Sequence, residues 1–280
     1  MDFPIGFMQG RLSPLVDGKI QAFPRHHWRD EFPIANEHGF KIMEWVLDQD
    51  QLYENPLMTE KGREGIKRLM YKYNVSIPAV TGGCFMQVPF YKTSGNERDN
   101  LLKDLKNIIN ASEALGLNYI MIPLVDNGRI ENKSQEINLK KGLDSIESEL
   151  DATGIKICFE SDFNPKKLAN FIDGFNTEYF SINYDIGDSA SLGYNPDEEI
   201  SLYGHRIVNV HVKDRLLNGT TVPLGDGNAD IPAVLKALVR IGYKGNYILQ
   251  TARSKKNSHL EDLLHYRAQV SEWLRLPAYN

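Results

Sequence analysis

The sequence predicts an α/β protein of one domain, a (β/α)8 barrel or TIM barrel that spans residues 1–280. Strand-like apolar segments alternate with helix-like amphipathic segments along the whole chain, and eight such pairs can be counted. No linker rich in proline or serine interrupts the alternation. A chain of 280 residues also falls within the usual size range of a single barrel of this kind.

The eight predicted strands are mostly continuous apolar runs. This is expected of strands that are covered by helices on one face and packed by side chains on the other. In chain order they span residues 3–9, 40–46, 76–81, 118–123, 155–160, 179–185, 206–212 and 246–251.

Amphipathic segments between these strands predict the helices. They span residues 60–73, 97–115, 134–150, 165–172, 231–241 and 259–274. Within the second of them, apolar residues recur on one helical face. The segments 13–28 and 82–96, which follow the first and third strands, are predicted to be longer loops that form the walls and lid of a site.

Charge and hydropathy exclude several classes of partner. The formal net charge of -5 argues against a nucleic-acid partner, since such proteins generally present a basic surface. No apolar run approaches the roughly 18 to 20 residues that cross a bilayer, and the first residues do not resemble a signal peptide. We therefore expect a cytoplasmic protein without a membrane partner, and homo-oligomer formation stays open.

Four predicted strands end on a polar side chain: Glu160, Asp185, His211 and Gln250. The carboxyl ends of barrel strands meet at one rim, and neighbouring strands lie about 4.8 Å apart, so the four side chains can converge. Two carboxylates, an imidazole and an amide oxygen suit a divalent cation such as Mn, Mg, Co or Zn. Each residue alone could equally be a capping or ion-pairing residue.

Basic residues follow the seventh and eighth strands. Lys213 could hold an oxyanion or phosphate group, or it could pair locally with Asp214. Arg215 and Arg253 lie where this fold often binds phosphate, so they are candidates for substrate binding. The alternative is an exposed basic loop.

Several segments resemble, in the same order, those of the xylose isomerase-like superfamily of TIM barrels. They are KICFE, NYDIGDSA, VNVHVKD and VPLGDGNADIPAVLKALVRIGYKGNYILQ. The superfamily includes sugar and sugar-phosphate isomerases and epimerases, inosose dehydratases and endonuclease IV, and the resemblance covers nearly the whole chain.

The resemblance implies a single metal site formed by Glu160, Asp185, His211 and position 250. It also implies that Glu160 exchanges a proton beside a carbonyl that the metal polarises. Glu44 in KIMEW stands where the superfamily often has a glutamate, which implies contact with the substrate or a place in the second sphere.

Two positions depart from the pattern of the superfamily. Gln250 replaces a second glutamate, and an amide can coordinate a cation or bind a substrate hydroxyl but cannot transfer a proton. One-base chemistry through Glu160 remains. Asp188 replaces the histidine of a D-x-G-H motif, and it could accept a hydrogen bond from the substrate or cap the following helix.

The sequence therefore predicts a metal-assisted isomerase or epimerase, or a related lyase, that acts on a small sugar, sugar phosphate or polyhydroxy carbonyl compound. Glu160 would be the base and Lys213 would stabilise developing negative charge. The alternative is a non-catalytic or metal-free sugar-binding barrel. An endonuclease IV-like phosphodiesterase is disfavoured, because the second and third strands end on Glu44 and Thr81 rather than on histidines.

Overall fold

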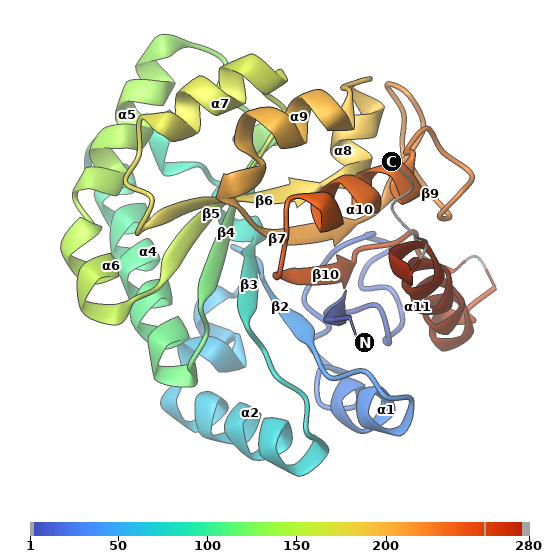
Figure 1. The fold of residues 1–280 in the computed structure, drawn as a ribbon. Coiled ribbons are helices and arrows are strands. Elements are labelled where there is room, and N and C mark those ends of the chain that lie inside the picture. The colour runs from blue at the N-terminus through green and yellow to red at the C-terminus, as the bar shows by residue number, and fades with distance from the viewer. Residues whose placement is uncertain (1–2, 255, 276–280) are drawn as a thin grey trace.

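Eight parallel strands close into a barrel in the computed structural model, which describes residues 3–254 and 256–275 (Figure 1). The order around the barrel is β1-β2-β3-β4-β5-β6-β7-β10, and β10 pairs with β1 to close the ring. Each strand overlaps one of the eight predicted segments. Their bounds are β1 Ile5–Met8, β2 Met43–Leu47, β3 Ala79–Gly82, β4 Tyr119–Leu124, β5 Lys156–Ser161, β6 Phe180–Asp185, β7 Ile207–Val212 and β10 Asn246–Leu249.

Helices surround the barrel and cover its outer face (Figure 1). The α-helices are α1 Glu31–Glu37, α2 Glu60–Tyr73, α3 Gly83–Gln87, α4 Gly95–Leu115, α5 Lys133–Asp144, α6 Glu147–Thr153, α7 Pro165–Asp173, α8 Ile186–Ser191, α9 Pro196–Tyr203, α10 Ile231–Arg240 and α11 His259–Arg275. Short 3-10 helices span Leu52–Glu54, Pro56–Met58, Phe90–Lys92, Asp126–Gly128 and Gly204–Arg206. No helix in the described part of the chain is both long and apolar enough to cross a membrane.

The predicted helix 134–150 is two helices, α5 and α6. The break lies at Ser145, whose hydroxyl donates to the carbonyl of Gly142 at 2.6 Å. Ile146 has φ -118° and ψ 2°, which is outside helical geometry. A serine that bonds a preceding carbonyl competes with the helical hydrogen-bond pattern, and the periodicity of the apolar residues does not reveal it.

The short helices α8 and α9 were not predicted. The carboxylate of Asp185 accepts the N–H of Asp188 at 2.8 Å and caps α8. Asn195 caps α9, and Pro196 occupies its first turn. An asparagine followed by proline and three acidic residues is a signal for a helix start that could have identified α9 from the sequence.

The barrel interior changes character along its axis. Ala79, Met121 and Cys158 form a small apolar cluster that is separate from the main core between sheet and helices. Nearer the carboxyl ends of the strands, fully or almost fully buried polar side chains replace them: Glu44, Thr81, Asn183, Asn209 and His211. Because buried polar groups require partners, this end of the interior is where a site is expected.

Two hairpins rise from the rim at this end. The segment 13–28, which was predicted to be a rim loop, contains an isolated antiparallel bridge between Val16 and Lys19. The strands β8 Asp214–Arg215 and β9 Thr221–Val222 form a second, antiparallel hairpin after β7. The other predicted rim segment, 82–96, is not a plain loop, since it includes α3 and a 3-10 helix.

Candidate metal centre

Glu160, Asp185 and His211 converge at the carboxyl ends of β5, β6 and β7. Each offers one ligand atom, and these atoms lie within 4.8 Å of one another. Nδ1 of His211 is 3.0 Å from Oε2 of Glu160 and 3.8 Å from Oδ2 of Asp185. Asp185 and His211 are direct neighbours across the β6–β7 pair, and all three residues are buried. The cluster could therefore hold a metal ion.

Glu44 lies on the opposite side of the His211 ring. Its Oε1 is 2.8 Å from Nε2 of His211, and its Oε2 accepts a hydrogen bond of 2.9 Å from Asn209. The hydroxyl of Thr81 also donates to this carboxylate. In a neutral imidazole, a carboxylate at Nε2 favours the tautomer with the proton on that nitrogen, which would leave the Nδ1 lone pair to bind a cation together with Glu160 and Asp185.

Two roles were expected for Glu44, contact with the substrate and a place in the second sphere. Its side chain has no exposed surface, and its carboxylate lies behind the His211 ring. The strands β2 and β7 are separated by β1 and β10 in the barrel wall. The contact therefore crosses the interior of the barrel.

Two asparagines support the cluster, and sequence reasoning missed both. Nδ2 of Asn183 donates to Oε2 of Glu160 at 2.7 Å, and Oδ1 of Asn183 accepts a hydrogen bond of 2.9 Å from Asn209. Each asparagine precedes a candidate ligand by two residues, Asp185 and His211 respectively. Since side chains at i and i+2 share one face of a strand, this spacing could have revealed them.

The electrostatics of the cluster differ from group to group. Burial raises the pKa of Glu160 above its ordinary value, although the hydrogen bond with His211 opposes the shift. Burial alone would also raise the pKa of Asp185, but the charges of Lys213 and His211 lower it. The pKa of His211 is raised well above its ordinary value, because the carboxylates of Glu44, Asp185 and Glu160 outweigh the effect of burial. A carboxyl group with a raised pKa is the better proton acceptor of the two.

Lys213 and Arg215 converge on Asp188. Oδ1 of Asp188 is 2.8 Å from Nζ of Lys213 and 2.7 Å from Nη1 of Arg215. Lys213 also lies 3.1 Å from Oδ2 of Asp185, and the neighbouring carboxylates raise its pKa despite its burial. Lys213 is therefore a fixed cation and a hydrogen-bond donor. Asp188 does not cap α8, because Asp185 does.

Asp214 does not serve as a local partner of Lys213. Its fully buried carboxylate accepts backbone hydrogen bonds from Gly225 and Gly227, at 2.9 and 3.0 Å, and from Ala229 at 3.0 Å. Through these bonds Asp214 anchors the loop after β9 to the base of the β8–β9 hairpin. Since Arg215 belongs to that hairpin, the anchor helps to fix its position.

Gln250 follows β10, beside the strand that carries His211. Its backbone N–H donates to the carbonyl of Val212 at 3.1 Å, which continues the β10–β7 pairing. Its Oε1 is buried and has no hydrogen-bond partner among the described residues. An orphaned buried acceptor on the strand end that neighbours His211, together with two carboxylates and an imidazole, is a set of donor types that fits a divalent cation.

Arg253 binds the protein's own backbone. Its guanidinium donates to the carbonyl oxygens of Gly10 and Ser13 in the loop after β1. This arrangement makes it a support for the loop, whereas Arg215 keeps one bond to Asp188 and two to the carbonyl of Gly219.

A closed parallel barrel with acidic and imidazole side chains at its carboxyl rim defines a class of enzyme-like TIM barrels. The family described as xylose isomerase-like TIM barrel matches residues 32–275. The chain belongs to this family, as the sequence motifs predicted.

Individual relatives are distant. A Haemophilus influenzae protein that carries the provisional name L-ribulose-5-phosphate 3-epimerase SgbU is 20% identical over 271 residues, which cover 91% of this chain and 93% of the relative. Among solved structures, the zinc-binding IolI protein is 15% identical with a TM-score of 0.77, covering 98% of this chain and all of the other. The 3-keto-D-glucoside 4-epimerase YcjR of Escherichia coli is 16% identical with a TM-score of 0.71, covering 95% and 100%. At such identities the structures establish the shared fold.

Proposed function

We propose that this protein is a metal-assisted isomerase, epimerase or related lyase that acts on a sugar, sugar phosphate or other polyhydroxy carbonyl compound. The observation that carries the proposal is the buried convergence of Glu160, Asp185 and His211, with ligand atoms within 4.8 Å of one another. The names of the distant relatives, which include sugar epimerases, agree with this class of chemistry.

Glu160, Asp185 and Nδ1 of His211 would hold the cation, with Oε1 of Gln250 as a neutral fourth donor. When bound, a divalent cation would act as a Lewis acid that polarises the carbonyl group of the substrate. Glu44 and Asn209 keep the His211 ring oriented, and Asn183 orients the carboxylate of Glu160.

Glu160 is the residue that would remove the proton beside the carbonyl. Its carboxylate is buried at the rim and accepts a hydrogen bond of 2.7 Å from Asn183, which fixes the position of the base. The ammonium of Lys213 stays charged and offers hydrogen bonds to the oxygen on which negative charge develops.

Gln250 limits the stereochemistry of the reaction. An epimerisation that inverts a carbon by two bases needs a proton donor on each face of the substrate, and a carboxamide cannot be one of them. If Glu160 removes and returns the proton on one face of the substrate, the chemistry suits isomerisation between neighbouring carbons. Removal alone suits elimination of a leaving group. We therefore favour one-base chemistry.

One feature supports the alternative of a metal-free sugar-binding barrel. His211 lies between Oε1 of Glu44, 2.8 Å from its Nε2, and Oε2 of Glu160, 3.0 Å from its Nδ1, so each ring nitrogen has a carboxylate partner within the protein. Under this alternative the polar rim would bind sugar hydroxyls without turnover.

Solvent deuterium exchange separates the two functions. Wild-type protein is incubated in deuterated water with a panel of aldoses, ketoses and their phosphates, with and without Mn, Mg, Co or Zn. The proposal expects metal-dependent incorporation of deuterium beside a carbonyl, and its loss in Glu160→Gln but not in Glu37→Gln, a change at an exposed position of α1. Sugar binding without exchange under every metal condition would instead establish the binding function.

A further inference from the structure

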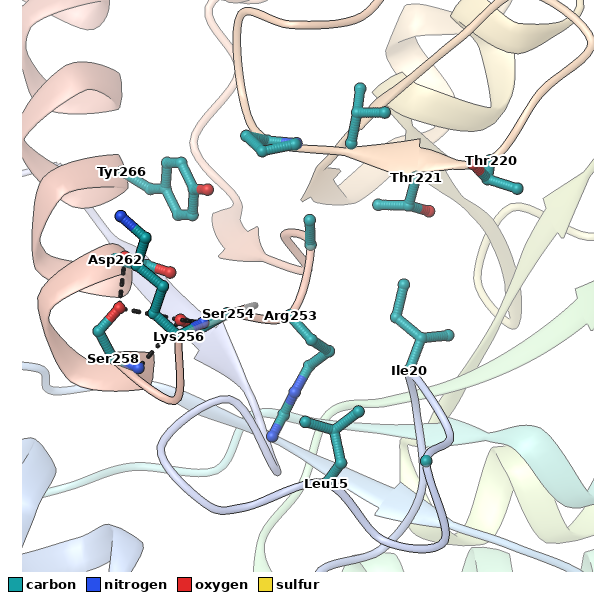
Figure 2. Close-up of a pocket in the computed structure, with 14 residues that line it drawn as sticks. Leu15, Ile20, Thr220, Thr221, Arg253, Ser254, Lys256, Ser258, Asp262 and Tyr266 are labelled. Atoms are coloured by element: carbon teal, nitrogen blue, oxygen red, sulfur yellow. Dashed lines mark hydrogen bonds between the residues drawn. The ribbon is translucent and has the colours of Figure 1, made fainter.

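A pocket of about 590 Å3 opens at the carboxyl-terminal rim of the barrel (Figure 2). Its walls come from the loop after β1, the β8–β9 hairpin, the segment after β10 and the first turns of α11. The volume lies in the range of about 300–1,000 Å3 that is typical of small-molecule sites. None of Glu160, Asp185, His211 and Gln250 lines it.

One wall is built by a hairpin that the sequence encodes directly. Asp17 and Gly18 have φ of 51° and 69°, and the N–H of Lys19 donates to the carbonyl of Val16 at 2.9 Å. Positive φ at both central residues is the requirement of a type I′ turn, for which Asp-Gly is a preferred sequence. The turn brings the flanking residues Leu15 and Ile20 to the same side of the pocket (Figure 2).

Internal bonds hold this wall in place. Nη1 of Arg11 donates to the carbonyl of Ile20 at 3.1 Å, and its Nε donates to the carbonyl of Thr251 at 2.9 Å. Arg253 holds the carbonyl of Ser13, and the buried carboxylate of Glu31 accepts the N–H groups of Gly10 and Leu12. The wall is thus preorganised, which lowers the cost of binding.

The chemistry of the pocket suits a neutral ring with many hydroxyl groups. Leu15 and Ile20, 40% and 46% exposed, present aliphatic surface that no core covers, and the largely buried Tyr266 on α11 lines the pocket away from them (Figure 2). Apolar surface of this kind packs against the C–H faces of a sugar ring. Thr220 and Thr221 line the pocket with hydroxyl groups, whereas Ser254 and Asp262 are already bonded to Ser258.

The balance of charge disfavours a phosphate group in this pocket. The carboxylate of Asp262 lines the same pocket as Lys256, and the guanidinium of Arg253 is already engaged by two backbone carbonyls. An anion would therefore meet a carboxylate and a committed cation beside Lys256, whereas a hydroxyl-rich ring meets donors and acceptors of both kinds.

Two residues that line the pocket are linked to the surroundings of the candidate metal centre. Ala252 lines it and lies two residues after Gln250, a separation of at most about 7 Å along the chain. Thr221 lines it too, and pairs in the β8–β9 hairpin with Arg215, the partner of Asp188. A two-ring substrate could reach both places.

From these features we infer that the pocket is a subsite for a second, uncharged glycosyl ring, so that the substrate is a glycoside rather than a lone monosaccharide. The inference extends the proposed function and rests on it, because a bound glycoside is a substrate only if the protein is the proposed enzyme. The binding of a sugar ring in the pocket stands on its own, since it uses none of the metal ligands.

The test measures binding of maltose, cellobiose, lactose and sucrose, and of their constituent monosaccharides, by calorimetry with Mg or Zn present. Ile20→Trp places a large side chain in the pocket from an exposed loop position, and Ile137→Trp is the matched control at a 43% exposed isoleucine on α5, outside the pocket. Asp262→Asn is a second variant that keeps the shape of the side chain.

We expect at least one disaccharide to bind tenfold or more tightly than its constituents. Ile20→Trp should remove that advantage, Asp262→Asn should reduce it several-fold, and Ile137→Trp should leave it within twofold. Equal affinity for disaccharides and monosaccharides across the panel, or no effect of Ile20→Trp, overturns the subsite. So does competition by inorganic phosphate, which would identify an anion site.

The same panel distinguishes failure of the subsite from failure of the enzyme. Disaccharide binding that persists in Glu160→Gln, together with absence of deuterium exchange in wild type, removes the catalytic proposal and keeps the sugar-binding pocket. Deuterium exchange on monosaccharides, without any preference for disaccharides in binding, removes the subsite and keeps the catalytic proposal.

Discussion

Nε2 of His211 lies 2.8 Å from Oε1 of Glu44, and neither side chain has any exposed surface. The contact joins β2 to β7 across the barrel interior, on the side of the imidazole that faces away from Glu160 and Asp185. Glu44 therefore controls which nitrogen of His211 is free to bind a cation, although Glu44 itself lies on the side of the ring away from Glu160 and Asp185.

Glu44→Gln should weaken the binding of Mn or Zn by about 10- to 100-fold, the usual effect of removing a carboxylate partner of a ligand histidine. The amide can still contact Nε2, but it no longer stabilises the charge that the imidazole shares with a bound cation. Calorimetric titration of the metal measures the change.

Glu31→Gln is the control for this prediction, because Glu31 is also a fully buried glutamate but lies at the start of α1, where its carboxylate supports the loop after β1. It should leave metal affinity unchanged. Equal losses of affinity in both variants would show that the effect is general destabilisation and would remove the positioning role of Glu44.

Asp214→Asn should lower the free energy of unfolding by about 1–3 kcal/mol, since it disturbs a buried acceptor of three backbone N–H groups. Urea denaturation measures this loss. Asp197→Asn is a matched change in an exposed ion pair with Arg240, and such pairs contribute about 0–1 kcal/mol. A loss no larger than that of Asp197→Asn would mean that the loop after β9 does not depend on its anchor.

The strands and the candidate ligands could be predicted from the sequence because both follow local rules. A buried parallel strand is an apolar run, and a side chain at its carboxyl end faces the rim whatever the neighbouring strands contain. The placement of Glu160, Asp185 and His211 at the rim follows from this rule alone.

The support of the ligands could not be predicted in the same way. Asn183 and Asn209 look like polar interruptions within apolar strands until barrel closure brings their side chains into one buried layer with Glu44. The contact between Glu44 and His211 spans 167 residues and two intervening strands. Interior layering of this kind depends on the register of every strand between the partners.

The titration of Glu31 should give stability a distinct pH dependence. Burial raises its pKa from 4.5 to about 7, against the hydrogen bonds from Gly10 and Leu12, which lower it. Below pH 4.5 the group is protonated in both states. As the pH rises to about 7, the unfolded chain loses its proton first, so the free energy of unfolding falls by about 3 kcal/mol in total and levels off above pH 7.

Chemical denaturation of wild type and Glu31→Gln between pH 4 and 8 tests this dependence, because the difference between the two curves cancels most other groups. The difference should change across pH 4.5 to 7 and be flat above it. Glu37→Gln, at an exposed position of the same helix, should give a constant difference. A constant difference for Glu31→Gln would contradict the shifted pKa.

Gln250→Glu should tighten binding of a divalent cation by tenfold or more. The orphaned Oε1 of Gln250 is a candidate donor that brings no charge, and replacing the amide with a carboxylate would add a third negative charge to those of Glu160 and Asp185. At an effective dielectric constant near 20, a unit charge at 4 Å from another gains about 4 kcal/mol per charge, part of which desolvation offsets. A gain of tenfold or more is therefore a conservative expectation.

A melting scan at fixed metal concentration measures this change, since a ligand at 100 times its dissociation constant stabilises the fold by about 2.7 kcal/mol. The increase in Tm should be larger for Gln250→Glu than for wild type, smaller for Gln250→Ala, and absent when Glu160→Gln is added to either. If Gln250→Glu gains nothing, the side chain at 250 does not face the cation. Glu160, Asp185 and His211 would then supply all the protein ligands of the cation, and Gln250 would remain a candidate for substrate binding.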